Sequence, residues 1–402
     1  MIRGIRYQAG MDIRQLEDAG FGLVEYVFGP EPLVSLEPSE APGSPQSEAE
    51  GMHTVQSETA GRMTGLSMPF TAVEDGTFSQ AIDRASEIKA SYLVIETVGA
   101  DDGTNLYCIL EKYLEKIKSA GIKVWIENGY NREVCSSYSR VTGNAYSEAT
   151  LLAETIDRLN DDAGTECFGI CLNTGHGNLL GRNLCGMIER LGQRIGLLHA
   201  TDNDGKNSQC QMPYTFTKGR GELSTDWYGI IGALAMSGFK GPVVYDIASL
   251  FEVSPVCLRP GWYSLLSSVA REWENILELQ EFLKEMFQAD LNEAGEAGEL
   301  VLFGAGRMFL NYMEVWGEAY PPSFIVDNNH KLWGSMRSDI AIRPPSALLE
   351  GKEHPPFVLI CNMYHASIEK QLDAMGIRWR RYDDKYFFRY QNFVHKQGAD
   401  IC

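Results

Sequence analysis

Residues 168–176, Phe-Gly-Ile-Cys-Leu-Asn-Thr-Gly-His, form an apolar run of strand length that ends in polar residues and a glycine turn. An apolar run bounded by turn residues is typical of a strand that is buried on both faces, as in a parallel sheet. Similar runs begin near residues 4, 22, 63, 92, 124, 195 and 243. Together they predict eight strands before about residue 285.

Helix-length amphipathic stretches separate these runs, at residues 77–90, 106–120, 147–159 and 225–237, and several of them end in glycine. Eight strands, each followed by a helix, match the repeat of a (β/α)₈ barrel, whose usual length is about 250 residues. The sequence therefore predicts an α/β protein with a (β/α)₈ TIM barrel over residues 1–288.

Residues 299–402 predict a second, small Rossmann-like α/β domain. An apolar strand at 300–303 runs into Gly304-Ala-Gly306 and a helix, a second strand ends at Asp327, and a third begins at Phe357. Residues 289–298 are small, acidic and glycine-containing, which suggests a linker. A length of 402 residues also favours more than one domain.

The segment 31–60 interrupts the barrel pattern. It holds six glutamates, four prolines and no lysine or arginine, which predicts an irregular, solvated loop. Because it follows the second strand, it is expected at the carboxyl end of the barrel, where active sites lie. Two roles fit it: a lid or subunit contact, or an insertion without function.

Composition and charge exclude several classes of protein. Hydrophobic residues make up 44% and charged residues 22%, as in ordinary globular domains. The net charge of −19 argues against nucleic acid or an anionic membrane as a partner. The nine cysteines form no Cys-x-x-Cys spacing, and neither a signal peptide nor a membrane span is evident. We therefore expect a cytoplasmic protein with reduced thiols.

Polar residues stand at the ends of the predicted strands, where a TIM barrel carries its catalytic groups. Carboxylate, amide and imidazole groups of this kind are ligands of Mg²⁺, Mn²⁺ and Zn²⁺, so the pattern indicates a divalent metal site. Glu96 also fits a buried ion pair, and Asp202 a local turn. The full set is Glu96, Glu127, Asn128, Asn173, His176, His199, Asp202 and Asp246.

Four motifs follow one another along the predicted barrel. They are Val124-Trp-Ile-Glu127-Asn128, Ile170-Cys-Leu-Asn173-Thr-Gly-His176, Leu197-Leu-His199-Ala-Thr-Asp202-Asn-Asp204-Gly and Gly219-Arg220-Gly221-Glu222-Leu. In this order they resemble the strand motifs of the xylose-isomerase-like barrel superfamily. That superfamily holds sugar isomerases and epimerases, inosose dehydratase, hydroxypyruvate isomerase and the apurinic endonuclease. The resemblance covers roughly residues 1–285.

The resemblance implies particular roles for the residues of these motifs. Glu127 and Asp246 correspond to a catalytic acid and base, His176 to a substrate contact or neighbour of the ligands, and Arg220 to a loop that approaches the substrate. A divalent cation, Mn, Mg, Co or Zn, is implied with the ligands Glu127, Asn173, His199 and Asp246.

Some positions depart from the superfamily pattern. Asn173 stands where an aspartate binds the metal, and Asp246 where a longer glutamate is usual, which lowers the attraction to a cation and the reach into the site. Histidines of a three-zinc endonuclease are missing, with Ser67 near the end of the third strand and Thr217-Lys218 before the Gly-Arg-Gly loop. Together with the negative charge, this argues against DNA repair.

Two carboxylates on opposite faces of a keto-sugar, with a metal that polarises its oxygens, support proton transfer through an enediolate. The sequence thus predicts a metal-dependent isomerase or epimerase of a sugar or sugar derivative, with a small-molecule carbohydrate as substrate. A dehydratase using the same enediolate and an inactive carbohydrate-binding barrel are alternatives. A homo-oligomer is compatible with the sequence.

In the second domain, Gly304 and Gly306 follow a strand and precede a helix, and Asp327 comes 21 residues later. This is the context of a dinucleotide site. Phe309 occupies the third glycine position of that motif and argues against close approach of a pyrophosphate. The domain resembles those that accompany sugar-modifying and polysaccharide-biosynthesis enzymes, which favours a structural or nucleotide-sugar-binding role over NAD chemistry.

Overall fold

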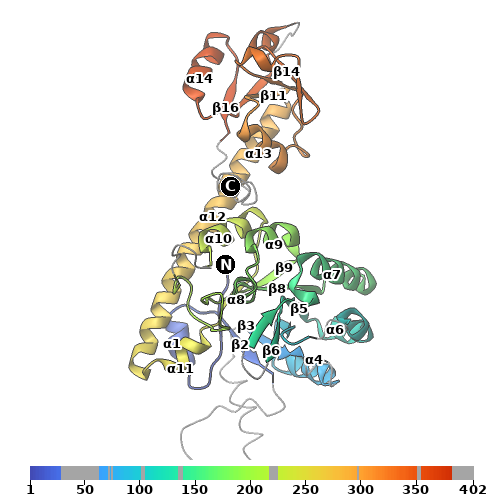
Figure 1. Cartoon of the computed structure of the whole chain (residues 1–402), viewed down its shortest axis with the longest axis vertical. Coiled ribbons are helices and arrows are strands. Elements are labelled where there is room, and N and C mark those ends of the chain that lie inside the picture. Colours follow the sequence, from blue (N-terminus) through green and yellow to red (C-terminus); the bar gives the residue numbers. More distant parts are fainter. Residues whose placement is uncertain are drawn as a thin grey trace, which may run out of the picture. The chain divides into compact units, whose positions relative to one another are not determined.

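A computed structural model of the chain describes residues 1–28, 63–70, 73, 76–100, 105–134, 139–216, 225–296, 298–350 and 355–382. The acidic segment 31–60 and the loop around Arg220 lie outside these described residues. The chain divides into two units, Met1–Leu277 and Glu278–Cys402. Each unit is built around its own mainly parallel sheet (Figure 1).

The first unit is a closed barrel of eight parallel strands, as the sequence predicted. The strands pair in the order β1-β10-β9-β8-β5-β4-β3-β2, and β2 pairs with β1 to close the ring. Every predicted strand run forms one of them. They are β1 (Arg3–Arg6), β2 (Leu23–Val27), β3 (Met63–Pro69), β4 (Tyr92–Glu96), β5 (Lys123–Glu127), β8 (Phe168–Asn173), β9 (Ile195–Ala200) and β10 (Val243–Tyr245).

Helices follow the strands and cover the outside of the barrel (Figure 1). In α7, the buried Leu152, Ile156 and Leu159 recur every three or four residues and form one apolar face. Gly164 ends this helix in the left-handed conformation, with φ of 66°. The helices of this part are α1 (Ile13–Asp18), α4 (Phe78–Glu87), α5 (Leu106–Leu110), α6 (Leu114–Ala120), α7 (Ala149–Ala163), α8 (Thr174–Leu179), α9 (Leu184–Leu191), α10 (Trp227–Met236), α11 (Ala248–Val253) and α12 (Arg259–Glu296).

The indole ring of Trp125 packs inside the barrel, below the carboxyl ends of the strands. Trp125 lies against Gly169 and Gly196, where an added Cβ would come within 2.4 Å and 2.7 Å of the indole. The glycines therefore make room for this side chain. Because side chains two residues apart on a strand share a face, Glu127 lies in the next layer above Trp125, toward the carboxyl end. Trp125 thus packs below Glu127 in the interior of the barrel.

Two elements at the carboxyl ends of the strands were not predicted. A hairpin of β6 (Asn131–Val134) and β7 (Ser139–Thr142) follows β5. The short helix α8 begins directly after β8, since the side chain of Asn173 accepts from the backbone N–H of His176 and caps it. Residues 173–176 are therefore a strand-to-helix junction.

Residues 289–296, expected to be part of a linker, are instead the last part of α12. Leu291 and Ala294 are fully buried three residues apart, so packing of this face outweighs the low helix propensity of Gly295. The two units divide within α12.

The second unit contains a six-stranded sheet in the order β13-β14-β12-β11-β15-β16, parallel except for the β13–β14 pair. Its central strands are apolar and buried, including Val301, Phe303 and Val358, and helices separate the strands in sequence. Its elements are β11 (Leu300–Phe303), α13 (Arg307–Val315), β12 (Phe324–Val326), β13 (Met336–Arg337), β14 (Ile340–Arg343), β15 (Phe357–Ile360), α14 (His365–Ala374) and β16 (Trp379–Arg381).

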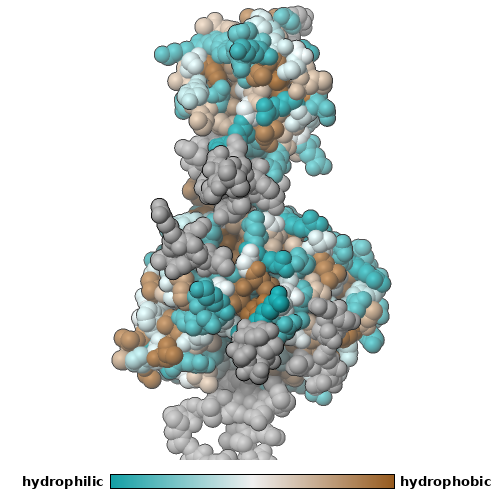
Figure 2. Space-filling model, in the orientation of Figure 1, coloured by the Kyte–Doolittle hydropathy of each residue, from teal (hydrophilic) through white to brown (hydrophobic). Residues whose placement is uncertain are grey.

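Hydrophilic and hydrophobic residues are interspersed over the visible faces of both units (Figure 2). Over the described ranges, no helix combines the length and apolar character needed to cross a membrane. Seven cysteines lie in these ranges; none of them is in a disulfide, and four are buried.

Candidate active site

Polar side chains from all eight barrel strands gather at the carboxyl ends. Parallel strands bring these ends to one mouth, so residues far apart in sequence become neighbours. We call the eight residues the mouth ring: Arg6 (β1), Glu25 (β2), Ser67 (β3), Glu96 (β4), Glu127 (β5), Asn173 (β8), His199 (β9) and Asp246, which follows β10.

Glu127 is the centre of one half of the mouth ring. Its Oε1 lies 2.6 Å from Nδ1 of His199, and the amide nitrogen of Asn173 donates to the same oxygen at 2.9 Å. Its Oε2 is buried and has no hydrogen-bond partner. Three of the four predicted ligands, Glu127, Asn173 and His199, are therefore in contact, although Asn173 turns its N–H to Glu127 and its oxygen to the start of α8.

Glu25 holds the other side of the His199 ring. Its Oε2 lies 3.1 Å from Nε2 of His199 and accepts a hydrogen bond from the Tyr92 hydroxyl at 3.0 Å. All three side chains are buried. The result is a buried carboxylate–imidazole–carboxylate chain from β2 through β9 to β5.

The charges in this chain support one another. Burial disfavours the charged form of His199, but the carboxylates of Glu25 and Glu127 raise the pKa of its imidazole well above the ordinary value. Burial also disfavours ionised Glu25 and Glu127, yet the neighbouring histidines lower the pKa of each carboxyl. The two contacts of the ring thus favour an imidazolium between the two carboxylates.

His176, a predicted catalytic residue, lies beside Glu127. Its Nδ1 donates to the backbone carbonyl of Asn128 at 2.8 Å and lies 3.7 Å from Oε2 of Glu127. The ring meets Tyr130 edge-on, with 5.0 Å between centroids. Asn128 is itself fixed, because its side chain bonds both the N–H and the carbonyl of Asn173. The polar groups after β5 and β8 thus form one rigid unit.

Arg6 organises the other half of the mouth ring. Its guanidinium forms an ion pair with Glu96, lies 3.5 Å from Oδ2 of Asp246, and donates to Ser67 at 3.4 Å. Burial alone would lower the pKa of Arg6, but Glu96 and Asp246 raise it above its usual value. The predicted ligand Asp246 is therefore paired with an arginine.

Sequence reasoning missed Arg6, Glu25, Tyr92 and Cys171. The signal for the first two was present, because a charged residue inside a short apolar strand run is costly unless it is paired or used. Tyr92 and Cys171 gave no such signal, since both residue types are common in cores. Their contacts arise only when the barrel closes.

Glu127, Cys171 and His199 each offer a ligand atom, and these atoms lie within 4.8 Å of one another. Two observations fit a divalent cation. Glu25 holds Nε2 of His199, the arrangement that orients a metal-binding histidine. Carboxylate, imidazole and thiol groups are also the ligand types that Zn²⁺ binds. Binding at Nδ1 of His199 would displace its proton, as metal binding generally does. Burial raises the pKa of Cys171 to about 12, so this thiol is neutral until a cation binds.

Arg220 lies outside the described residues. Asp202 accepts hydrogen bonds from the Thr225 hydroxyl at 2.8 Å and from the Asn203 backbone at 3.0 Å, and through Oδ2 from the Phe216 backbone at 3.3 Å. Only the contact with Asn203 is local; the others tie Asp202 to residues 14 and 23 positions further along the chain, so a local turn alone does not describe its role.

In the second unit, Gly304 and Asp327 meet at the ends of β11 and β12. Asp327 accepts from the backbone N–H of Ala305 at 2.9 Å and of Asn329 at 2.8 Å, so each carboxylate oxygen has a donor. Gly304 has φ of +113°, and an added Cβ would lie 2.7 Å from the Cys361 carbonyl oxygen. Gly306, in contrast, faces open space. A nucleotide role for these three residues stays a prediction.

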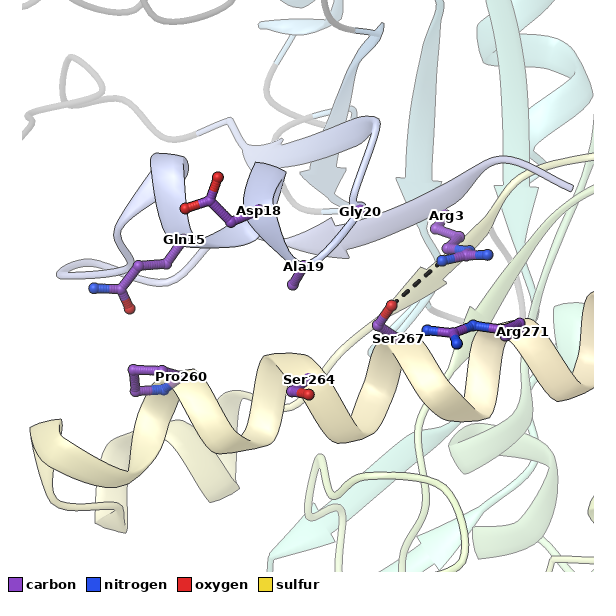
Figure 3. A pocket seen from close by; sticks show the side chains of 9 residues that line it. All are labelled: Arg3, Gln15, Asp18, Ala19, Gly20, Pro260, Ser264, Ser267 and Arg271. Carbon is purple, nitrogen blue, oxygen red and sulfur yellow. Dashed lines mark hydrogen bonds between the residues drawn. The ribbon is translucent and has the colours of Figure 1, made fainter.

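A cavity of about 550 Å³ lies at the opposite end of β1, between α1 and α12. Ser264, Ser267 and Arg271 line it from α12, and Arg3 donates to Ser267 at 3.3 Å (Figure 3). Arg3 and Arg6 are the first and last residues of β1, so this cavity is distinct from the mouth ring.

Residues 13–250, from α1 to α11, match the family described as xylose isomerase-like TIM barrel. A sequence search of curated proteins finds no match. Among solved structures, an L-ribulose 3-epimerase is similar, with 16% identity and a TM-score of 0.47 over 71% of this chain and 98% of that one. A D-psicose 3-epimerase from Clostridium cellulolyticum H10 has 14% identity and a TM-score of 0.47, over 68% of this chain and 99% of that one. A 3-keto-D-glucoside 4-epimerase from E. coli has 13% identity and a TM-score of 0.44, over 67% of this chain and 99% of that one.

Proposed function

The chain belongs to the xylose isomerase-like TIM barrel family, and we propose that its barrel interconverts isomers of a small carbohydrate by moving a proton beside a carbonyl group. The observation that carries this proposal is the different state of the two oxygens of Glu127. Oε1 is held by His199 and Asn173, whereas Oε2 is buried without a partner. A carboxylate fixed in this way accepts a proton without reorienting.

Glu127 acts as the base. Its neighbours keep it ionised, since the imidazoles of His176 and His199 lower the pKa of its carboxyl. Proton removal from the carbon next to a carbonyl places negative charge on the substrate oxygen, in an enediolate. A divalent cation held by Glu127 and His199, with Asn173 or Cys171 beside them, would polarise the substrate oxygens and stabilise this charge.

His176 is placed to exchange a proton with a substrate hydroxyl. Because Nδ1 donates to the Asn128 carbonyl, Nε2 is the ring nitrogen left to contact a substrate. Its side chain is 17% exposed, whereas those of Glu127 and His199 are enclosed. His176 is thus the most accessible of these three groups to a molecule entering the mouth.

Hydrogen exchange on sugars tests the proposal. The protein is incubated with Mn²⁺ and, in turn, 2-ketoses and aldoses of five and six carbons in ²H₂O, and proton NMR follows the C–H signals next to the carbonyl. We expect exchange with at least one sugar, and at least about a 100-fold slower rate for Glu127→Gln. The exposed Glu111→Gln on the outside of the barrel is the matched control and should react like the wild type. Equal rates in the wild type and Glu127→Gln would contradict the role of Glu127.

A further inference from the structure

The cavity between α1 and α12, at the end of β1 away from the mouth ring, is walled largely by short side chains (Figure 3). Ala19 and Gly20 line it directly after α1. The residues that line it from α12 follow one another at intervals of three or four and share one face of that helix: Pro260, Ser264, Ser267 and Arg271. The volume of about 550 Å³ is in the range of sites for small molecules.

Two hydrogen-bond donors meet at one end of this cavity. Arg3 uses Nε and Nη2 for an ion pair with Glu274, and its Nη1 donates to the Ser267 hydroxyl oxygen at 3.3 Å. Ser267 is buried, and its own hydroxyl hydrogen has no acceptor among the described residues. A guanidinium Nη carries two hydrogens, so Nη1 of Arg3 and the hydroxyl of Ser267 each keep one hydrogen for a ligand.

Arg271 supplies the positive charge of the cavity, because Glu274 neutralises Arg3. The Arg271 guanidinium lies beside Ser267 (Figure 3), and it has no ion-pair partner in the described part of the chain. Asp18 is the only acid among the described lining residues, and its carboxyl group points away from α12. On a chain with 35 basic and 54 acidic residues, an arginine without a partner that lines a cavity indicates a site for an anion.

Gly20 keeps this end of the cavity open. A Cβ added to it would lie 3.3 Å from Nη1 of Arg3 and 3.9 Å from Oγ of Ser267. The residue has φ of +88°, a left-handed conformation that favours glycine. Any larger residue would therefore fill space next to both donors.

We propose that this cavity binds a small polyhydroxylated molecule through a phosphate group, with Arg3, Ser267 and Arg271 as the donors to that group. Arginine suits phosphate, because the guanidinium presents paired N–H groups at a fixed spacing. Three donors, from β1 and α12, match the three terminal oxygens of a phosphomonoester, whereas a carboxylate offers two oxygens. The inference does not depend on the proposed function, since the mouth ring lies at the other end of β1.

The rest of the lining indicates the rest of the ligand. Gln15 and Ser264 add an amide and a hydroxyl farther from the two arginines (Figure 3). Both groups donate and accept, so they can exchange hydrogen bonds with the hydroxyls of a sugar. Ala19 and Pro260 are the only apolar side chains among the described lining residues. A sugar phosphate fits this polar lining better than a nucleotide, whose base needs apolar or aromatic surface.

Calorimetric titration of the full chain tests the inference. D-glucose 6-phosphate, D-ribose 5-phosphate and inorganic phosphate are titrated in turn at constant ionic strength. We expect at least one of the two sugar phosphates to bind at least about tenfold more tightly than inorganic phosphate, because Gln15 and Ser264 add hydrogen bonds to its hydroxyls. Equal affinities would overturn the assignment of a sugar phosphate, and no binding of any of the three would overturn the site.

Variants locate the bound phosphate. Arg271→Gln should weaken binding at least about tenfold, because hydrogen bonds to charged groups are the strong ones. Arg190→Gln, which changes an exposed arginine on α9, is the matched control and should bind like the wild type. Glu127→Gln changes the mouth ring and should also bind like the wild type. Unchanged affinity in Arg271→Gln, or loss of binding in Glu127→Gln, would place the phosphate elsewhere and overturn the inference.

Two glycine variants give a second measurement. Gly20 and Gly10 have φ of +88° and +84°, so alanine strains the backbone alike at both positions, but only Gly20 lines the cavity. Gly20→Ala should weaken binding at least about threefold and Gly10→Ala should not, because only the first adds a methyl group beside Arg3 and Ser267. The same affinity in both folded variants would overturn the placement of the ligand. If Gly20→Ala does not fold, Arg271→Gln still decides.

Discussion

Glu127 in the barrel and Asp327 in the second unit both follow apolar parallel strands, yet their surroundings differ. Glu127 has one oxygen held by side chains and one that is buried without a partner. Asp327 has a backbone N–H on each oxygen. The difference teaches that the end of a parallel strand makes an acid a candidate for chemistry, and that its hydrogen-bond partners distinguish one candidate from another.

Closure of the sheet causes this difference. In the barrel, side chains from eight strands face one another across an enclosed interior, where a cation or carboxylate finds partners from distant strands. In the open sheet, the turns after β11 and β12 each supply one backbone donor to Asp327. Side-chain ion pairs therefore surround the acids at the barrel mouth, whereas backbone N–H groups hold Asp327.

The largest expected effect comes from Glu25→Ala. Removing one partner of a buried ion pair leaves His199 and Tyr92 without their acceptor, and we expect the free energy of unfolding to fall by about 3–5 kcal/mol. Urea unfolding followed by tryptophan fluorescence measures it. Glu115→Ala removes an exposed ion pair with Lys118 and should change stability by less than about 1 kcal/mol. Equal effects of the two variants would erase the contrast between buried and exposed carboxylates.

Gly304→Ala tests the packing explanation for the second unit. Gly304 has a left-handed φ and lies close to the Cys361 carbonyl, so the added methyl group should lower the free energy of unfolding of the second unit by about 2–3 kcal/mol. Hydrogen exchange of the β11 and β15 amides measures this loss. Gly306→Ala is the matched control, because Gly306 has φ of −86° and open space around it. A similar loss at both positions would mean that close packing does not explain Gly304.

Asp327→Ala should remove two charge-assisted hydrogen bonds and destabilise the second unit by about 2 kcal/mol, less than the loss of Glu25 from the barrel. Hydrogen exchange of the β11 and β15 amides measures this loss of stability. Titration of the wild type and the variant with NAD⁺ and with a uridine-diphosphate sugar adds a second measurement. Binding to the wild type that the variant loses would show that Asp327 serves a ligand, and the contrast with Glu127 would fail.

Asn173→Asp should have the smallest effect in energy. A second carboxylate beside Glu127 should raise the affinity for Mn²⁺ at least about tenfold, which corresponds to about 1.4 kcal/mol. Calorimetric titration with Mn²⁺ checks this. Asn183→Asp makes the same charge change at the cap of α9, where Asn and Asp are equivalent, and should leave the affinity unchanged. A gain in both variants would indicate long-range attraction and not a local site.

Strand and helix positions in the barrel were predictable because each depends on a local period of apolar residues. The strand-end residues Glu127, Asn173 and His199 were predictable for the same reason. The helical end of α12 was missed, because buried Leu291 and Ala294 there outweigh the local glycines. The pairing of Asp246 with Arg6 was missed because almost the whole barrel sequence separates the two residues.

The sequence by itself determined the eight-stranded pattern, the second sheet and the polar residues that end the strands, since burial on both faces of a strand leaves a direct mark on residue order. Only the tertiary structure decided which of those residues are neighbours. Glu25 and His199 lie 174 positions apart and meet because the barrel closes, and Arg6 reaches Asp246 because β1 pairs with β10. Ion pairs of this kind depend on distance in space, which local patterns of residues do not encode.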